Sequence, residues 1–200
     1  MAVIPESEQS PHVRDRIEQA ARSIFAEQEF HKVGLADIAA GAHASLQTLY
    51  RYYGSKEAIL NACLQHALEE LAERMLDHLA GIETCKDRLS KVFWVVLDYF
   101  DRNPQAGRMM INSVYPGLWS ADSSALQHRL TGLFLNVLGD GQQSGVLNDQ
   151  VDTLTLLDYF YGVLVRLIQM HLLRQRPGPL AQQHAVMFEM LWRGISKPPL

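Results

Sequence analysis

Cysteine is scarce in this sequence. Its 200 residues include two cysteines, Cys63 and Cys85, and neither has neighbours at the spacing of metal ligands or of the partners of a catalytic nucleophile. A chain of this length can bury a core without disulfides, so we interpret both cysteines as buried thiols in a reducing compartment. We expect no metal, no cofactor and no catalytic residues.

Long hydrophobic runs are also missing. The longest apolar stretches, at 93–97 and 159–165, are far shorter than the roughly 20 residues of a membrane span. The amino terminus has no apolar core of signal-peptide length. These absences predict a cytoplasmic protein that does not contact a membrane.

The sequence has no excess of basic residues. The 18 Lys and Arg face 22 Asp and Glu, which gives a net charge of -4, and residues 1–60 hold six bases against eight acids. This balance argues against a protein that coats nucleic acid by bulk charge. The window from Ile38 to Lys56, however, contains two bases and no acid, which permits a local contact with nucleic acid.

The pattern of β-strands is absent as well. No run alternates apolar and polar residues with β-branched enrichment, whereas helical spacing recurs almost everywhere, so we predict an all-α fold of about nine helices. The expected helices cover about 11–30, 35–42, 45–53, 56–79, 84–102, a short segment ending near 115, 123–139, 152–175 and 179–195. Turn formers predict a loop over 139–149 and a tight hinge at 176–179, which makes the last two helices antiparallel neighbours.

Residues 35–53 carry the most specific signal. A short helix, a tight turn at His43 and Ala44, and a second short helix capped by Ser45 are typical of a helix-turn-helix, whose second helix meets base edges in the major groove of DNA. The Ser45 cap leaves the free amides of the helix and its positive dipole end facing a phosphate. His43 can also approach a phosphate, which would make binding mildly pH-sensitive.

The second short helix carries side chains suited to reading bases. We expect Gln47, Thr48 and Arg51 on its exposed side, where Gln pairs with adenine, Arg pairs with guanine and a Thr methyl touches a thymine methyl. Leu46 either touches a thymine methyl or lies against the domain, and the sequence leaves both open.

Other side chains nearby suit contacts to the DNA backbone. The phenols of Tyr50 and Tyr52 and the ammonium of Lys56 can bond phosphate without reading bases. Tyr52 is explained equally well by packing on the first helix. We expect Ile38, Leu49 and Tyr53 in the small core between the first three helices.

The segment FHKVGLADIAAGAHASLQTLYRYYGSKEAIL resembles the amino-terminal domain of the TetR family of bacterial transcriptional regulators, and the resemblance runs from about Arg14 to Leu60. It implies a helix-turn-helix DNA-binding domain over 1–55, followed by an effector-binding and dimerisation domain over 56–200. It also implies that Tyr50 and Lys56 contact phosphate. Two positions depart from the family pattern: Val33 and Gly34 stand where the second helix usually has a Thr or Ser cap, and His43 stands where the turn usually has glycine.

The resemblance further implies a homodimer on a palindromic operator in double-stranded DNA. The helices at about 152–175 and 179–195 would pair with their symmetry mates, and both are more apolar than one core-facing stripe requires. A small, mostly apolar effector would release the DNA. Candidate pocket residues are large and soft, with one basic partner: Phe93, Trp94, Leu97, Phe100, Met109, Met110, Tyr115, Trp119, Phe134 and Arg166.

Two other functions are compatible with the sequence. The departures at Val33 and Gly34 suit a helix-turn-helix remnant that acts through a protein partner. An all-helical enzyme would use His128 or His171 as a base, but the sequence shows neither paired carboxylates nor a catalytic motif. The leading interpretation is a ligand-responsive repressor.

Overall fold

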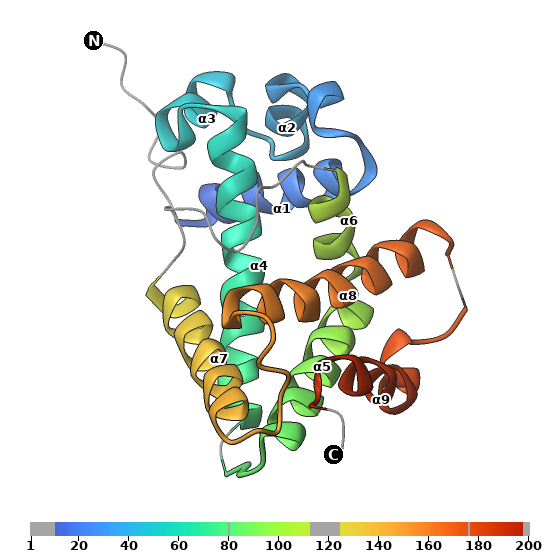
Figure 1. Cartoon of the computed structure of the whole chain (residues 1–200). Coiled ribbons are helices and arrows are strands. Elements are labelled where there is room, and N and C mark those ends of the chain that lie inside the picture. The colour runs from blue at the N-terminus through green and yellow to red at the C-terminus, as the bar shows by residue number, and fades with distance from the viewer. Residues whose placement is uncertain (1–10, 80, 113–124, 176, 198–200) are drawn as a thin grey trace. The chain divides into compact units, whose positions relative to one another are not determined.

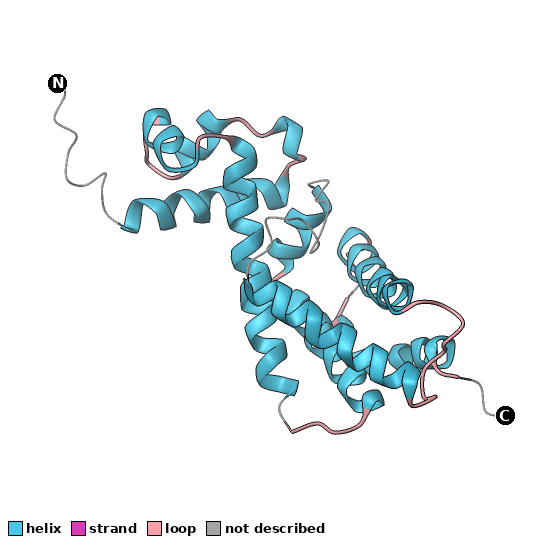
Figure 2. Ribbon diagram, turned by 60° about the vertical axis from the view of Figure 1, so that its left-hand side comes forward, coloured by secondary structure: helices cyan, strands magenta, loops and turns pink. Residues whose placement is uncertain are grey.

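The computed structural model describes residues 11–79, 81–112, 125–175 and 177–197. The chain forms two compact units, one of residues 1–67 with 105–117 and one of residues 68–104 with 118–200. Within the described ranges all regular structure is helical (Figures 1 and 2), apart from a single bridge between Leu147 and Ser196. The prediction of an all-α fold with nine α-helices over these ranges is confirmed.

The first unit packs short helical segments against α1 (Pro11–Glu27) and the start of a long helix. It contains α1 (Pro11–Glu27), η2 (Phe30–Lys32), α2 (Leu35–Gly41), α3 (Leu46–Tyr53), the start of α4 (Lys56–Leu79) and most of α6 (Pro104–Asn112). Its core is apolar, and Ile17, Ile38 and Leu64 are fully buried. The amide of Asn112 donates to the carbonyls of Phe25 and Ala26, which satisfies acceptors at the end of α1.

Helix α1 ends earlier than its sequence pattern predicts. We expected it to reach Phe30, but it stops at Glu27, and residues 30–32 form a separate 3-10 turn. The Phe30 ring stacks on Phe25 with centroids 5.9 Å apart. Phe30, the apolar residue with which the predicted helix ended, thus lies outside α1 and packs against the core through Phe25.

The second unit is built around α5. This helix (Cys85–Arg102) lies against α7 (Ala125–Gln143), α8 (Thr153–Leu173), η3 (Leu180–Gln183) and α9 (His184–Ile195). Phe93 is its centre, with ring centroids 6.1 Å from Phe160 and 5.9 Å from Phe188. These three rings are almost completely buried, so aromatic packing between α5, α8 and α9 forms the core.

Helix α7 runs past its predicted end. We expected a loop from residue 139, but the helix continues to Gln143 through Gly139 and Gly141. A Cβ at Gly141 would lie 2.6 Å from the Leu147 side chain, so the glycine is present for a close approach and not for a turn. The loop then turns at Gly145, whose φ is +73°.

Helices α8 and α9 leave much of their apolar surface uncovered in a single chain. The exposed side chains include Leu154, Tyr159 and Val165 on α8, and Val186 and Met190 on α9. By length and composition alone α8 could cross a membrane, with 28% of its most apolar window buried. We expected no such segment because we considered only unbroken apolar runs. In α8 the apolar residues are interrupted by Asp158 and Arg166, so the helix is apolar on average without containing a long unbroken run.

Candidate nucleic-acid interface

Helix α3 begins and ends at well-defined caps. The Ser45 hydroxyl accepts a hydrogen bond from the Thr48 amide at 3.1 Å, which satisfies one free donor of the first turn. At the other end, Gly54 adopts a φ of +75°, a conformation that favours glycine and stops the helix. The cap predicted at Ser45 is confirmed, and it fixes which side chains α3 exposes.

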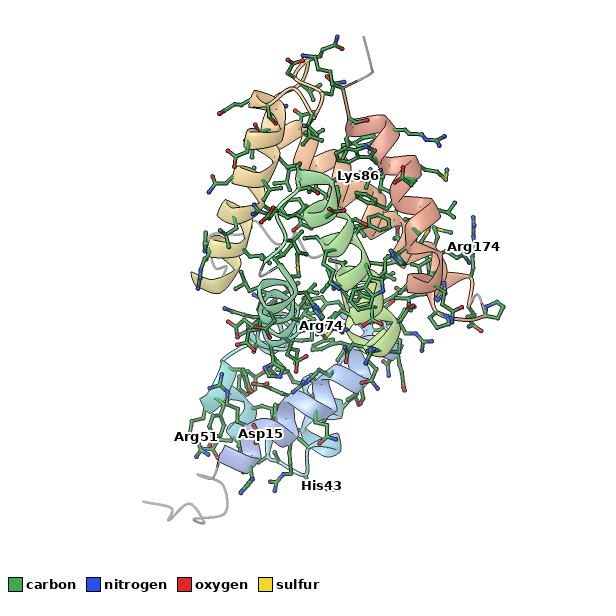
Figure 3. All side chains as sticks on the ribbon, turned by 90° about the horizontal axis from the view of Figure 1, so that it is seen from below. Asp15, His43, Arg51, Arg74, Lys86 and Arg174 are labelled. Atoms are coloured by element: carbon green, nitrogen blue, oxygen red, sulfur yellow. The ribbon has the colours of Figure 1, made fainter. Side chains whose placement is uncertain are left out.

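The side chains of α3 divide into two faces. Leu46, Gln47, Tyr50 and Arg51 are exposed, and Arg51 lies at the periphery of the first unit in Figure 3. Thr48 and Leu49 are buried, and Tyr52 and Tyr53 are half-buried against the core. At 3.6 residues per turn, the four exposed positions cover an arc of about 140°.

The prediction that Thr48 lies on the exposed side is wrong. Its side chain is 1% exposed, and its hydroxyl lies 2.8 Å from the Ser45 hydroxyl. Thr48 therefore supports the cap from inside, and its methyl is not presented to a base. Leu46 is 44% exposed, which decides the alternative that the sequence left open: this side chain does not lie against the domain.

The turn between α2 and α3 holds a strained histidine. His43 is exposed and has a φ of +51°, in the left-handed region that non-glycine residues rarely adopt. The Ala42 carbonyl beside it accepts a hydrogen bond from Arg16 Nε at 3.2 Å. Arg16 thus ties the turn to α1, and the His43 side chain extends outward (Figure 3).

Lys56 does not point outward as a phosphate contact would. Its ammonium donates to the carbonyls of Phe30 and Val33, each at 2.8 Å, and lies 4.4 Å from the centroid of the Phe30 ring. The position implied by the resemblance is therefore corrected: Lys56 turns into the first unit, where its ammonium binds the Val33 carbonyl and shares the Phe30 carbonyl with the Val33 amide.

The start of α2 is closed by its own residues. The Gly34 amide donates to the Asp37 carboxylate at 3.1 Å, so an acid three residues into the helix satisfies the amide of the cap residue, although Gly34 has no side chain to accept a first-turn amide. Asp37 is exposed, so the start of α2 carries a negative charge. The sequence showed the departure at Gly34, but we did not connect it with Asp37.

Glu18 was not predicted as an organising residue. Its carboxylate accepts a hydrogen bond from the Tyr53 hydroxyl at 2.8 Å and from Arg14 at 3.3 Å. Burial raises the pKa of Tyr53, and the Glu18 carboxylate raises it further. No local signal marks this contact, because Glu18 and Tyr53 are 35 residues apart in sequence.

The predicted effector residues do not line one cavity. Phe93, Leu97 and Phe100 are core residues of the second unit, whereas Met109 and Met110 pack in the core of the first. Tyr115 and Trp119 lie outside the described residues. Trp94 borders an open groove with Lys91, and Arg166 borders a separate hollow near the 176–179 hinge.

Phe134 does line an apolar cavity, of about 300 Å³, within the second unit. Leucine and valine side chains from α4, α5 and α7 form most of its wall, and Arg88, Asn136 and Asp140 supply polar groups. The lining residues are Leu76, Leu79, Arg88, Leu89, Val92, Leu130, Leu133, Phe134, Asn136, Val137 and Asp140.

The two histidines considered as catalytic bases have ordinary surroundings. His128 is exposed on α7. His171 Nε2 lies 3.8 Å from Asp101, but the Asp101 carboxylate already accepts the amides of Leu180 and Ala181 at 2.9 and 2.7 Å. Asp101 thus caps η3, and no cluster of metal-ligating side chains occurs in the described ranges.

A capped second helix with one exposed face, joined to α2 by a tight turn, defines a helix-turn-helix DNA-binding protein. The model of the tetR family of bacterial regulatory proteins matches residues 17–63, which include all of this motif. Residues 17–63 are thus a helix-turn-helix domain of the TetR type, and the chain is similar to helix-turn-helix transcriptional regulators.

Relatives and solved structures agree with this assignment. The transcriptional regulator UidR of Escherichia coli K12 is 26% identical over 155 residues, which cover 76% of this chain and 79% of UidR. A TetR-family regulator from Marinobacter aquaeolei VT8 superposes with a TM-score of 0.76 at 20% identity, over 96% of this chain and all of that one. FadR from Bacillus subtilis, solved with stearoyl-CoA, gives 0.72 at 20% identity over 90% and 98%.

Proposed function

We propose that this chain is a ligand-responsive repressor that binds a palindromic operator as a homodimer and leaves it when a small, mostly apolar effector binds. The observation that carries the proposal is the exposed face of α3. Leu46, Gln47, Tyr50 and Arg51 stand on one arc of a capped helix, which is the arrangement that reads base edges in the major groove. Residues 1–55 would bind DNA, and residues 56–200 would bind the effector and dimerise.

The exposed face supplies both kinds of contact. Gln47 suits adenine and Arg51 suits guanine, while the Tyr50 hydroxyl, Ser45 and His43 suit phosphate. The Arg51 guanidinium lies 5.3 Å from the centroid of the Tyr52 ring, so the aromatic face restricts the arginine before DNA binds. Tyr52 then acts through Arg51 and does not need to reach the phosphate itself.

Dimerisation would cover the apolar faces of α8 and α9. Leu154 is 60% exposed and Met190 is 71% exposed, which is unusual for large apolar side chains without a partner surface. Gly162 lies on the same face of α8, and a Cβ there would meet nothing within 4 Å. A C2 dimer formed through these helices would hold two α3 helices about 34 to 36 Å apart on DNA.

The effector would occupy the cavity between α4, α5 and α7. Its wall is largely leucine and valine, so it favours an apolar ligand body. The Arg88 guanidinium, which donates to the Ile82 carbonyl at 2.6 Å, would face a polar end of the ligand. FadR, which has the same fold, was solved with stearoyl-CoA, and this supports testing acyl compounds first.

DNA binding tests the central claim. The purified protein should shift a fragment of its own upstream DNA in preference to random DNA, as a complex of dimer size that weakens with salt. Arg51→Ala and Tyr50→Phe should weaken the shift, whereas Arg174→Ala, an exposed arginine of the second unit, should leave it near the wild-type level. A protein that prefers no genomic fragment would contradict the repressor and would favour the partner-dependent remnant.

A separate measurement tests the effector. Fatty acyls, aromatics and cationic dyes should be screened by thermal shift, and a stabilising compound should also release bound DNA. Val137→Phe narrows the cavity and should reduce the shift, while Val151→Phe, an exposed position outside the cavity, should not. A flat screen across all three classes would contradict an apolar inducer.

A further inference from the structure

Exposed large apolar side chains are rare in the first unit. Among its described residues they are Leu46, at 44% exposure, and Tyr50, at 56%. Both belong to α3, and they lie one helical turn apart on the face that also carries Gln47 and Arg51. Tyr50 has a hydroxyl that suits water and phosphate alike, whereas Leu46 has no polar atom in its side chain, so its exposure needs a different explanation.

Leu46 is not among the residues packed in or against the core of the first unit. Leu49 and Ile38 fill the space between α2 and α3 with less than 2% of their surface exposed. Ser45 and Thr48 complete the cap without any contribution from the Leu46 side chain. An apolar group at the first position of a recognition helix therefore remains in water until a partner surface covers it.

We infer that Leu46 is a specificity residue that reads the C5 methyl of a thymine in each half of the operator. This inference rests on the proposed function. The thymine methyl is the main apolar group on base edges in the major groove, and it matches an isobutyl side chain that carries no donor or acceptor. Thr48, whose methyl we expected to fill this role, is buried, which leaves Leu46 as the apolar group beside Gln47.

The contact also fits the charge of the first unit. With few cations on the α3 face, phosphate attraction contributes little to affinity. A buried methyl contact adds affinity without charge and adds it only where thymine is present. Binding would then depend on sequence more than on salt.

Replacing thymine by deoxyuridine tests the inference, because it deletes the methyl and leaves base pairing intact. An operator is first selected from random-sequence DNA with the purified full chain, and each thymine is then replaced in turn. One position per half-site should lose affinity about fourfold, and both together about 15-fold, as expected for one buried methyl at each.

The variant Leu46→Ala makes the test specific. It should bind the thymine operator more weakly than the wild type and should bind the thymine and deoxyuridine operators equally at that position. Gln47→Ala should lose affinity but keep the fourfold preference for thymine. Circular dichroism of both variants checks that α3 is still folded.

The possible failures are distinguishable. If selection yields no preferred sequence, the proposed function fails before Leu46 is tested, and the inference falls with it. If an operator is found but no deoxyuridine weakens binding, or if Leu46→Ala keeps the thymine preference, the inference alone is overturned.

Discussion

The Lys56 ammonium donates a hydrogen bond to the Val33 carbonyl, 23 residues earlier in the chain, at 2.8 Å. Val33 directly precedes Gly34, the N-cap residue of α2, and Lys56 is the first residue of α4. The same ammonium binds the Phe30 carbonyl. One side chain therefore connects the start of α4 to both ends of the segment that leads into the helix-turn-helix.

Lys56→Met should destabilise the protein. The methionine keeps most of the apolar stem but removes the ammonium from the Val33 carbonyl and one of two donors from the Phe30 carbonyl, which also accepts the Val33 amide. Hydrogen bonds to charged groups contribute about 1.5 to 3 kcal/mol each. We expect the free energy of unfolding to fall by about 2 kcal/mol in urea titrations. Lys32→Met, at an exposed lysine, is the control. Unchanged stability together with weaker DNA binding would return Lys56 to the phosphate role.

The positive φ of His43 predicts that substitutions at this position change the stability of the protein. A β-branched residue is strained in the left-handed region, where a side chain costs about 1 to 2 kcal/mol, so His43→Val should destabilise by about that amount. His43→Gly should match or slightly exceed the wild-type melting temperature. His31→Val, at a position without positive φ, controls for loss of an imidazole. Equal effects of valine at positions 43 and 31 would argue against strain in the turn.

The two thiols should react at different rates. Burial raises the pKa of Cys63 from an ordinary 9.0 to about 12, and burial also raises the pKa of the half-buried Cys85. Because the thiolate is the reactive form, a disulfide reagent at pH 8 should label Cys85 first and Cys63 only after unfolding. The variant Cys85→Ser should show no fast phase. Fast labelling of Cys63 in that variant would contradict its burial.

The same burial gives stability a defined dependence on pH. A neutral thiol with a raised pKa in the folded state contributes fully below pH 9, and this contribution is lost as pH rises from 9 towards 12. Unfolding titrations at pH 8, 9 and 10 should therefore show falling stability. Cys63→Ala should reduce this decline. A smaller slope should remain, from Cys85 above pH 9 and, above pH 10, from Tyr53 and Tyr161, whose pKa values burial also raises.

Met190→Glu should separate the proposed dimer. It places a charge among the apolar side chains of α8 and α9, and burying that charge unpaired is strongly unfavourable. Sedimentation should show a monomer with unchanged helix content and much weaker operator binding. Gln143→Glu adds the same charge at an exposed end of α7 and should remain dimeric. A dimeric Met190→Glu protein would move the interface elsewhere.

Local signals predicted the helix-turn-helix, and long-range contacts account for what they missed. The Ser45 cap and the turn at His43 follow from residues within a few positions of one another. The burial of Thr48 depends on the cap geometry and on α3 packing, which helical spacing over eight residues does not resolve. Lys56 was misplaced because its two acceptors are 23 and 26 residues away.

The sequence predicted the helices of the second unit but not the position of its cavity. Its helices follow from apolar spacing, whereas the position of a cavity depends on which side chains meet across α4, α5 and α7. Large apolar residues identified the core and not the cavity: Phe93 fills space between helices. Among the predicted pocket residues that the structure describes, only Phe134 borders the apolar cavity. Gly141 shows the same limit, because its close neighbour Leu147 is invisible to local turn rules.

The bond between Tyr53 and Glu18 limits how α3 can move. Tyr53 is the last residue of α3, and Glu18 on α1 also accepts a hydrogen bond from Arg14. The C-terminal end of α3 is therefore bonded to α1, while the Ser45 cap holds its N-terminal end. A reorientation of α3 on DNA that keeps this bond would therefore also move α1.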